Sequence, residues 1–233
     1  MNSNIQIIPV LCNEKNMANY SYILHNKKNN LTIIIDAAEA NPIIKKLSEL
    51  NLTPSYILTT HHHFDHVEGN LPLKEKYNLK IIAPEKEFSL VPGADISVNE
   101  QTTLDLEGFD FQIIQAGGHT NGHILYYLKN NKALFTGDIL FNLCVGGLFE
   151  GSSRELFQSL EKISLLPNDT LIFPGHEYTR SCLPRNITKS DEFNIYLQKM
   201  IDRENLKLAP ATLLEEKMFN PYLQFSKIND FME

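Results

Sequence analysis

Several features that would assign the chain to a membrane or to a nucleic acid are scarce in this sequence. No apolar run approaches the roughly 18 residues that a membrane-spanning helix requires. The first residues, M-N-S-N-I-Q-I-I-P-V, also lack the basic start of a signal peptide. Lys and Arg number 21 against 28 Asp and Glu, which gives a formal net charge of -7. Because duplex binding usually needs a basic face, we expect neither a membrane nor a nucleic acid as partner.

Cysteine is scarce as well. The three cysteines, Cys12, Cys144 and Cys182, lie far apart in the sequence and form no C-x-x-C pair. An odd number of isolated cysteines is more typical of free thiols in a reducing compartment than of a disulfide framework. The sequence therefore predicts free thiols and a cytoplasmic location.

What is present is the composition of an ordinary globular protein. The 233 residues are 42% hydrophobic and 21% charged, which suits one large domain with a sizeable core, or one domain with a small appendage. No internal repeat or low-complexity linker divides the chain. We expect a monomer with an α/β domain over residues 1–175 and a helical C-terminal region over residues 176–233.

Short apolar runs of strand type alternate with helical stretches in the first two-thirds of the chain. Ile43, Leu47 and Leu50 recur at helical spacing between two such runs, which predicts a strand-helix-strand unit in a partly parallel sheet. A second helix is expected to begin at Ser152, because Ser152 and Glu155 form a capping-box pattern. The expected strands cover residues 33–36, 56–59, 80–83, 109–115, 124–128, 133–136 and 171–173, and a third helix is expected over residues 190–206.

The densest chemical signal is the segment T-H-H-H-F-D-H, which directly follows an expected strand. Its imidazole and carboxylate groups are the ligands that zinc, iron and manganese accept. Alternate residues of an extended loop point the same way, so His61 and His63 can bind one ion. A turn after Phe64 can direct Asp65 and His66 to a second ion. A solvated histidine cluster is the alternative interpretation.

Two further histidines and one aspartate stand beside glycine at the ends of expected strands. His119 follows G-G, Asp138 follows T-G and His176 follows P-G. Active sites of sheet proteins gather at strand ends, because tight turns there let side chains converge. Each residue alone would more often be structural, but their shared strand-end position favours one site. Two ligand sets follow: His61, His63 and His119 for one ion, and Asp65, His66 and His176 for the other, with Asp138 between them.

The remaining histidines, His25, His62 and His123, are not needed as ligands. His62 is expected to point away from the cluster by alternation along the chain, and His123 stands just before an apolar strand. We expect structural or supporting roles for these three residues.

The T-H-H-H-F-D-H segment is an instance of the T-H-x-H-x-D-H pattern, and in it the chain resembles the metallo-β-lactamase superfamily. The segments G-G-H-T-N-G-H, L-F-T-G-D-I-L-F, P-G-H-E-Y-T and A-T-L-L-E-E-K-M-F-N-P-Y-L resemble successive motifs of one member family, glyoxalase II or hydroxyacylglutathione hydrolase. The resemblance covers nearly the whole chain. It implies an α/β fold, a four-layer αββα sandwich of two mixed sheets between helices, with a small helical C-terminal appendage that binds substrate.

Carried over residue by residue, the resemblance implies the same two ligand sets, with Asp138 bridging two divalent ions. The ions would be zinc, or alternatively iron or manganese. Asp65 and Asp138 would be the catalytic carboxylates, and a hydroxide shared by the two ions would be the nucleophile. The family's glutathione-contacting tyrosine corresponds to Tyr178.

Departures from the family pattern concern the substrate. Gly147 stands where the family has a basic residue that binds a carboxylate, and Phe149 replaces a tyrosine of the same loop. Near the end, Gln224 replaces an arginine, and the chain stops at Glu233 before the family's Arg-x-x-Lys pair. Lys227 is the expected partial substitute. Each lost charge-assisted contact would weaken glutathione binding by about 1.5–3 kcal/mol.

The expected function is hydrolysis of a glutathione thioester, S-D-lactoylglutathione to D-lactate and glutathione, in methylglyoxal detoxification. No general acid is required, because a thiolate is a good leaving group: its conjugate acid has a pKa of about 8.5. The nearest alternative is a hydrolase of the same fold that acts on a different thioester or ester. Two further alternatives are a persulfide dioxygenase with one iron and a metal-binding module without turnover.

Overall fold

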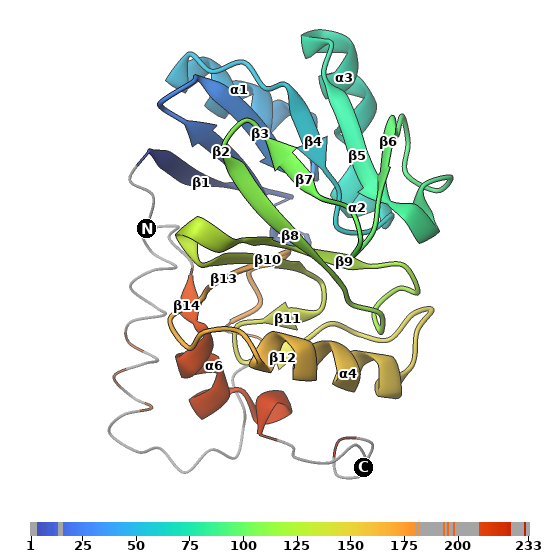
Figure 1. The fold of residues 1–233 in the computed structure, drawn as a ribbon, viewed down its shortest axis with the longest axis vertical. Coiled ribbons are helices and arrows are strands. Elements are labelled where there is room, and N and C mark those ends of the chain that lie inside the picture. Colours follow the sequence, from blue (N-terminus) through green and yellow to red (C-terminus); the bar gives the residue numbers. More distant parts are fainter. Residues whose placement is uncertain are drawn as a thin grey trace.

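The computed structural model describes residues 4–13, 16–179 and 210–224, together with the single residues 181, 193, 195, 198 and 231. Within this part of the chain, two six-stranded sheets pack face to face, and helices cover their outer faces (Figure 1). The layers therefore follow the order helices, sheet, sheet, helices. The αββα sandwich expected from the family resemblance is confirmed.

The first sheet is antiparallel in its first half and parallel in its second half. The expected parallel pair is confirmed, since the strands on either side of the first helix lie next to each other. Three of the strands, the first, second and sixth, were not identified from the sequence. In sheet order, the strands are β1 (Ile5–Cys12), β2 (Asn19–Asn26), β3 (Leu31–Ile35), β4 (Tyr56–Leu58), β5 (Lys80–Pro84) and β6 (Ile96–Val98).

The second sheet is mostly antiparallel, with one parallel pair between β10 (Ala133–Gly137) and β13 (Leu171–Pro174). A separate two-stranded ribbon, β11 (Leu140–Phe141) and β12 (Cys144–Val145), follows β10. In sheet order, the strands of the second sheet are β14 (Ala211–Thr212), β13 (Leu171–Pro174), β10 (Ala133–Gly137), β9 (Ile124–Leu128), β8 (Phe109–Gln115) and β7 (Leu104–Leu106).

Two helices lie where apolar periodicity and a capping pattern predict them. In α1 (Ala40–Leu50), Ile43 and Leu47 are buried. In α4 (Ser153–Ser164), the backbone N–H of Glu155 donates to the Ser152 hydroxyl and the Glu155 carboxylate accepts from the Ser152 N–H, so the predicted capping box is confirmed. The described part of the chain contains three further α-helices: α2 (Phe64–Val67), α3 (Asn70–Tyr77) and α6 (Leu213–Phe219).

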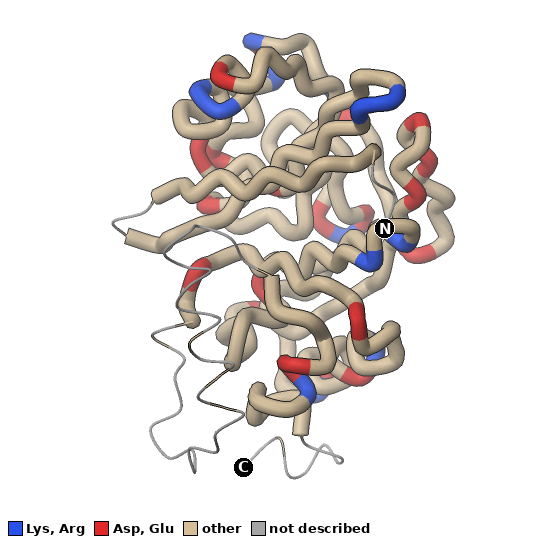
Figure 2. Tube along the Cα trace, turned by 90° about the vertical axis from the view of Figure 1, so that its left-hand side faces the viewer, with Lys and Arg blue, Asp and Glu red and all other residues tan. Residues whose placement is uncertain are grey.

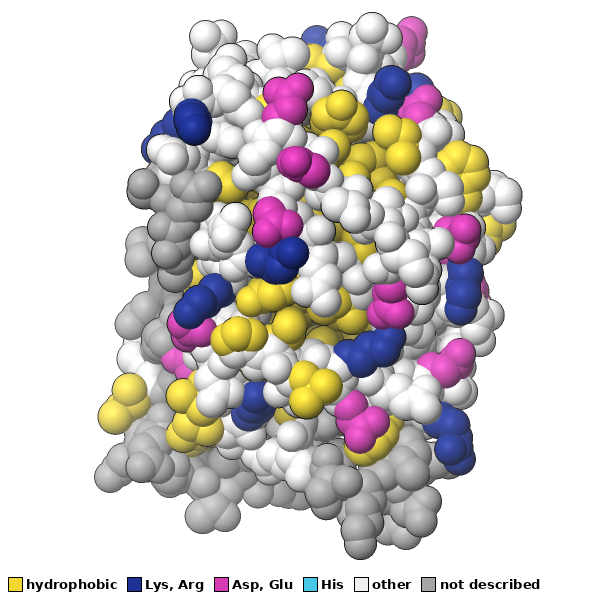
Figure 3. All heavy atoms as spheres, viewed as in Figure 1, with side chains coloured by type: hydrophobic (Ala, Val, Ile, Leu, Met, Phe, Trp, Pro, Cys, Tyr) yellow, Lys and Arg dark blue, Asp and Glu magenta, His cyan; other side chains and the backbone are white. Residues whose placement is uncertain are grey.

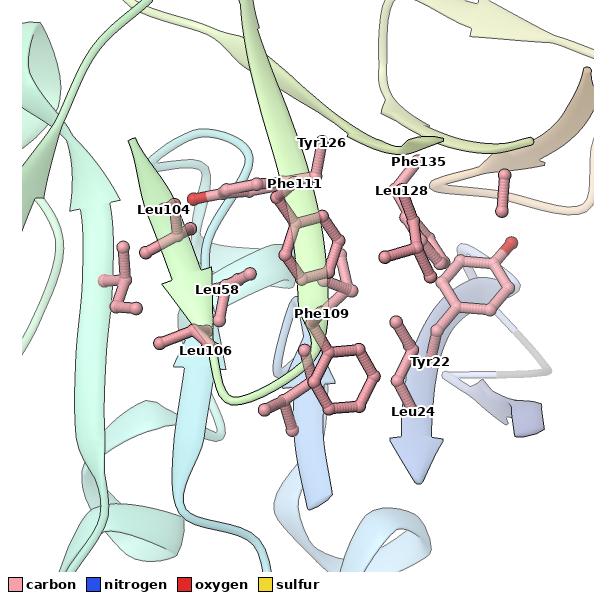
Figure 4. Close-up of a cluster of buried hydrophobic side chains, with 14 of the residues drawn as sticks. Tyr22, Leu24, Leu58, Leu104, Leu106, Phe109, Phe111, Tyr126, Leu128 and Phe135 are labelled. Carbon is pink, nitrogen blue, oxygen red and sulfur yellow. The ribbon is translucent and has the colours of Figure 1, made fainter. Parts of the chain in front are cut away.

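Alternation along the strands divides the apolar side chains among three buried layers. Ile33 and Ile35 of β3 point between the sheets, whereas Ile34 points toward α1. On the other sheet, Phe135 of β10 lies between the sheets and Leu134 packs toward α4. Because each such side chain contributes about 1.5–3 kcal/mol when fully buried, the three layers fix the register of both sheets. Figure 4 shows the layer between the sheets, where rings from β2, β8, β9 and β10 converge.

Charged residues lie mainly on helices, turns and strand ends (Figure 2). On the face drawn in Figure 3, lysine and arginine side chains alternate with aspartate and glutamate, and the described residues there form no continuous basic stripe. In the part of the chain that the structure describes, no helix is both long and apolar enough to cross a membrane.

The C-terminal residues that are described return to the second sheet. Ala211 and Thr212 pair with β13 in antiparallel orientation, and α6 begins at once with a capping box between Thr212 and Glu215. The division of the chain near residue 175 stays a prediction. The helix expected over residues 190–206 lies almost entirely outside the described residues.

Candidate metal centre

The loops at one edge of both sheets bring together all seven side chains of the two predicted ligand sets. The turn after β4 and helix α2 supplies four of them, and the loops after β8, β10 and β13 supply one each. Six of the seven are buried, and His63 is half-buried. Their arrangement matches the strand-end convergence that the sequence predicts. The seven residues are His61, His63, Asp65, His66, His119, Asp138 and His176.

The first predicted set is a group of three imidazoles. One nitrogen atom from each of His61, His63 and His119 lies within 4.8 Å of the others. Nε2 of His119 lies 2.9 Å from Nδ1 of His63. Three nitrogen donors at this spacing match one face of a tetrahedral zinc site.

The second predicted set combines nitrogen and oxygen donors. Nε2 of His66 lies 3.2 Å from Nε2 of His176, and Nε2 of His176 lies 3.4 Å from Oδ2 of Asp65. These three groups also fall within 4.8 Å of one another. His61 belongs to a further group with His66 and Asp138 within the same limit, so the two sets are adjacent.

Asp138 lies between the two sets. Its Oδ1 is 3.2 Å from Nε2 of His66, and its Oδ2 is 3.2 Å from Nε2 of His176 and 3.5 Å from Nε2 of His119. A carboxylate with two oxygens can bind two ions at once. The position of Asp138 therefore suits a bridging role.

Backbone carbonyls orient one histidine of each set. Nδ1 of His119 donates to the carbonyl of Gly147 at 2.7 Å, and Nδ1 of His176 donates to the carbonyl of Met17 at 2.8 Å. Since a carbonyl only accepts, each Nδ1 carries the proton and each Nε2 presents a lone pair to the centre. Partners of this kind are typical of metal-binding histidines.

Asp36 orients two more histidines, and sequence reasoning did not identify it as a functional residue. Nδ1 of His66 lies 3.0 Å from Oδ2 of Asp36. The Thr60 hydroxyl donates to the same carboxylate at 2.8 Å and can therefore accept from Nδ1 of His61 at 3.1 Å. Asp36 directly follows β3 with φ of 50°, a backbone region that aspartate tolerates better than most residues. A carboxylate at the end of a buried strand was the sequence signal that could have found it.

Asn19 orients the carboxylate of the second set. Its amide Nδ2 donates to Oδ2 of Asp65 at 2.9 Å and to the carbonyl of Asp65 at 3.0 Å. Asn19 is fully buried, and its backbone forms a β-bridge with His176. The first residue of β2 thus holds two members of the second set in place, and no local pattern in the sequence indicated this role.

Two buried polar atoms at the centre test whether a metal ion fits. Nε2 of His61 has no hydrogen-bond partner, and Oδ1 of Asp138 makes no bond of good geometry, although Nε2 of His66 lies 3.2 Å from it. Leaving buried polar groups unpaired costs about 1–3 kcal/mol each, and lone pairs that face one another repel. A cation among them removes both costs, so the residues present fit a divalent metal ion.

Proton affinities in the centre follow from burial and from its carboxylates. Burial holds the pKa of His61 well below its usual value. Burial opposes a charge on His66 too, but Asp138 and Asp36 outweigh it and raise the pKa of His66 well above the usual value. Burial would likewise raise the pKa of Asp138, yet His66 and His176 hold it well below. In the metal-free protein, a proton on His66 therefore supplies part of the positive charge that Asp138 needs.

The three histidines that were not expected to be ligands have hydrogen-bond or ion-pair partners of their own. His62 points away from the centre, and its ring contacts Glu87 at 2.9 Å and Glu150 at 3.1 Å. Nε2 of His123 accepts from the backbone N–H of Asp138 at 3.2 Å, and Nδ1 of His25 lies 3.0 Å from the Thr32 hydroxyl. All three remain outside the predicted ligand sets.

A cavity of about 410 Å³ opens onto the centre. Its walls beyond the metal-site residues are mostly apolar and aromatic, and they include the exposed rings of Phe64 and Phe149. Exposed aromatic side chains beside a buried polar centre are typical of a binding site. Among the described residues, neither lysine nor arginine lines the cavity. The other wall residues are Met17, Phe141, Gly147 and Tyr178.

The predicted substrate residues are placed as follows. Tyr178 stacks on His176, and Phe149 meets the edges of His63 and His119 at 5.4 and 5.1 Å between ring centroids. Gly147 is exposed on the cavity wall. Burial raises the pKa of Tyr178, so its hydroxyl stays protonated at neutral pH. Lys227 lies outside the described residues.

The prediction of free thiols was wrong for Cys144 and is confirmed for Cys12, whereas Cys182 lies outside the described residues. Cys12 is a buried free thiol, and burial raises its pKa to about 11. Cys144, the first residue of β12, is disulfide-bonded. Spacing along the sequence misled here, because folding can join cysteines that are far apart in the chain.

The family model of the metallo-beta-lactamase superfamily matches residues 16–176 of this chain. Solved structures share the fold. The crystal structure of BLEG-1 B3 metallo-beta-lactamase aligns with a TM-score of 0.74 at 23% identity, over 95% of this chain and 100% of that one. The crystal structure of TTHA1623 in a di-iron-bound form aligns with a TM-score of 0.68 at 24% identity, over 93% and 100%. The chain is a divalent-metal-binding member of the metallo-β-lactamase superfamily.

A curated relative narrows this assignment. The hydroxyacylglutathione hydrolase of Pelagibacter ubique (strain HTCC1062) is 40% identical over 229 residues, which cover 92% of this chain and 95% of that protein. Identity at this level over nearly the full length of both chains shows common family membership. Within the superfamily, the chain belongs to the hydroxyacylglutathione hydrolase, or glyoxalase II, family.

Proposed function

We propose that this protein is a hydroxyacylglutathione hydrolase that cleaves S-D-lactoylglutathione to D-lactate and glutathione with two divalent metal ions. The observation that carries the proposal is the convergence of five imidazoles on Asp138 at the floor of the cavity. The family to which the chain belongs supports the glutathione thioester as substrate.

The proposed ligands follow from the outer hydrogen bonds of the rings. His61, His63 and His119 would hold the first ion, and Asp138 would bridge to the second. Nε2 of His119 is free for this role because Nδ1 is held by a carbonyl, whereas His63 turns its Nδ1 toward His119. The second ion would be held by Asp65, His66 and His176.

The chemistry has two parts. Divalent ions bound at this centre would activate water and stabilise negative charge on the thioester carbonyl oxygen. The chain itself contributes the cavity, which orients the acyl group over the centre, and the two carboxylates of Asp65 and Asp138, which would offset part of the positive charge of the ions. Because thiolate leaves without protonation (pKa about 8.5), the protonated hydroxyl of Tyr178 is free to bind the glutathione part of the substrate.

Zinc is the proposed metal, with iron and manganese as alternatives. Nitrogen-rich and mixed nitrogen-oxygen sets of this kind suit all three ions, and availability helps to decide among them. The di-iron form of the related TTHA1623 structure supports including iron. Elemental analysis of the purified protein identifies the metal and gives the number of ions per chain. A content near one ion per chain would favour a mononuclear dioxygenase instead.

The ligand scheme is tested by Asp138→Ala. Because Asp138 contacts histidines of both sets, its loss should disrupt both ions and abolish turnover. The measurements are metal content and the rate of lactoylglutathione hydrolysis. Near-normal activity in the variant would contradict the two-ion scheme.

A second candidate is a same-fold hydrolase of a different thioester or ester. One observation favours it: none of the described residues that line the cavity is a lysine or arginine, whereas glutathione carries two carboxylates. The deciding experiment compares kcat/KM for lactoylglutathione and for a truncated thioester that has the same acyl group. A preference for lactoylglutathione supports the first proposal, and equal values support the second. Contacts from Gly147, Phe149, Tyr178 and Lys227 are part of the first proposal.

We also propose a monomer that acts in the cytoplasm without a membrane or nucleic-acid partner. The net charge of -7 supports the absence of nucleic acid, and the cytosolic glutathione pool supports the location. Disulfides are rare in that compartment, so the bond at Cys144 makes thiol titration of freshly isolated protein a direct check. Sedimentation analysis tests the monomer.

A further inference from the structure

Glu87 has an unusual position for a carboxylate. It ends the 3₁₀-helix η1 (Glu85–Glu87), which follows β5, and only 2% of its surface is exposed. A buried carboxylate is costly unless donors satisfy it. Glu87 has four such donors, and they come from two different loops. Both loops carry histidines of the first ligand set.

One oxygen of Glu87 binds the loop that carries His61 and His63. Oε2 accepts from the backbone N–H of His62 at 2.8 Å and lies 2.9 Å from Nδ1 of the same residue. His62 stands between the two proposed ligands. These bonds therefore fix the backbone at the point where His61 and His63 turn toward the centre and His62 turns away.

The other oxygen binds the loop that carries His119. Oε1 of Glu87 accepts from the hydroxyl of Thr120, which directly follows His119, and from the backbone N–H of Gly122 at 2.8 Å. A Cβ atom on Gly122 would lie 2.9 Å from Oε1. Glycine is thus required for this close approach, and the loop is held against Glu87.

The second ligand set has different supports. Asn19 holds Asp65, Asp36 holds His66, and a backbone carbonyl holds His176. Glu87 contacts none of these three ligands in its hydrogen bonds. Its influence should therefore fall on one side of the metal pair.

We propose that Glu87 is a positioning residue that clamps the two loops of the first ligand set together and thereby sets the affinity of the first metal ion. This inference rests on the two-ion scheme of the proposed function. Glu87 is not one of the proposed ligands and is not among the residues that line the cavity; it acts through the backbone and side chain of His62 and through Thr120 and Gly122. Partners of this kind change metal affinity by about 10- to 100-fold when they are lost.

The test titrates metal-free protein with zinc ions against a competing chelator. In Glu87→Gln, the side chain keeps its volume, but an NH₂ group replaces one of the two accepting oxygens. This donor then faces the hydrogen-bond donors of one of the two loops. We expect one of the two wild-type binding events to weaken by about 10- to 100-fold, while the other keeps its affinity. The matched control is Glu85→Gln on the same turn, where the side chain is exposed and, among the described residues, accepts only from Asn99. It should bind both ions like the wild type.

Thr120→Val is a second variant, which removes only one of the four hydrogen bonds. We expect a smaller loss at the same binding event. Wild-type affinity for both ions in Glu87→Gln would overturn the proposal, and so would wild-type affinity in Thr120→Val if Glu87→Gln fails to fold. Equal weakening of both ions would also overturn it, because a general loss of stability has that effect. A wild-type protein that binds fewer than two ions would instead contradict the two-ion scheme, and this inference with it.

Discussion

Tyr178 lies flat against His176, with 4.7 Å between ring centroids and 8° between ring planes. His176 belongs to the second ligand set, and Tyr178 lines the cavity. The stack therefore links a residue of the cavity wall directly to the second ligand set. The ring and the hydroxyl of Tyr178 should have separable roles, since only the ring contacts His176.

Tyr178→Phe should keep the stack and lose the hydroxyl. One hydrogen bond is worth about 0.5–1.5 kcal/mol, so KM for lactoylglutathione should rise by about 2- to 13-fold at unchanged metal content. Tyr178→Ala, which removes the ring as well, should also weaken the second ion. Steady-state kinetics and metal analysis distinguish the two variants. An unchanged KM in Tyr178→Phe would remove the hydroxyl from the proposed contacts.

Gly147→Lys should restore a basic residue where the family pattern has one. The position is exposed on the cavity wall, and among the described residues a Cβ there comes near only the Phe149 ring, at 3.4 Å. A charge-assisted contact of about 1.5 kcal/mol or more should lower KM for lactoylglutathione by about tenfold, with no gain on a truncated thioester. Gly147→Ala is the control and should behave like the wild type. A gain on both substrates would show that the lysine does not bind the glutathione part.

Gly175→Ala should damage the centre directly. A Cβ atom at Gly175 would overlap Oδ1 of Asp138 and lie 2.8 Å from Cε1 of His66. We expect the loss of at least one ion and of most activity, with the fold retained. Gly117→Ala is the matched control, because its nearest neighbour, the Glu155 side chain, would be 3.6 Å away. Circular dichroism checks the fold, and full metal content in Gly175→Ala would contradict this expectation.

The metal-free protein should lose stability as the pH falls through about 6.5. Burial holds the pKa of His61 and His123 well below that of the unfolded chain, so the unfolded state takes up protons that the folded state refuses. Their contribution is present above pH 6.5 and is lost on acidification. His66, whose pKa is raised, acts in the opposite sense. Burial also lowers the pKa of His63 and His119, so the histidines with a lowered pKa are more numerous than the one with a raised pKa.

The expected result is a lower Tm at pH 5.5 than at pH 7.5 for the metal-free wild type. His123→Gln should reduce the pH dependence of Tm, because it removes one histidine that has a lowered pKa and is not a proposed ligand. Thermal unfolding in the presence of a chelator measures both slopes. Equal slopes in the two proteins would show that His123 does not contribute.

The sequence by itself predicted the family and the seven side chains that the structure brings together. Each of these residues follows an apolar strand within a few positions, and a strand, a tight turn and a histidine are local features that a sequence displays directly. The same holds for α1 and for the cap at Ser152, where apolar spacing and a side-chain oxygen act within one helical turn.

Only the tertiary structure decided which atom of each ligand faces the centre and what holds it there. Asn19 reaches Asp65 across 46 positions, and Glu87 reaches His62 across 25. Such partners depend on which strands pair and how the sheets stack, and that arrangement follows from burial of the whole apolar set rather than from any short segment. For the same reason the bond at Cys144 and the strands β1 and β2 emerged only when the sheets were assembled.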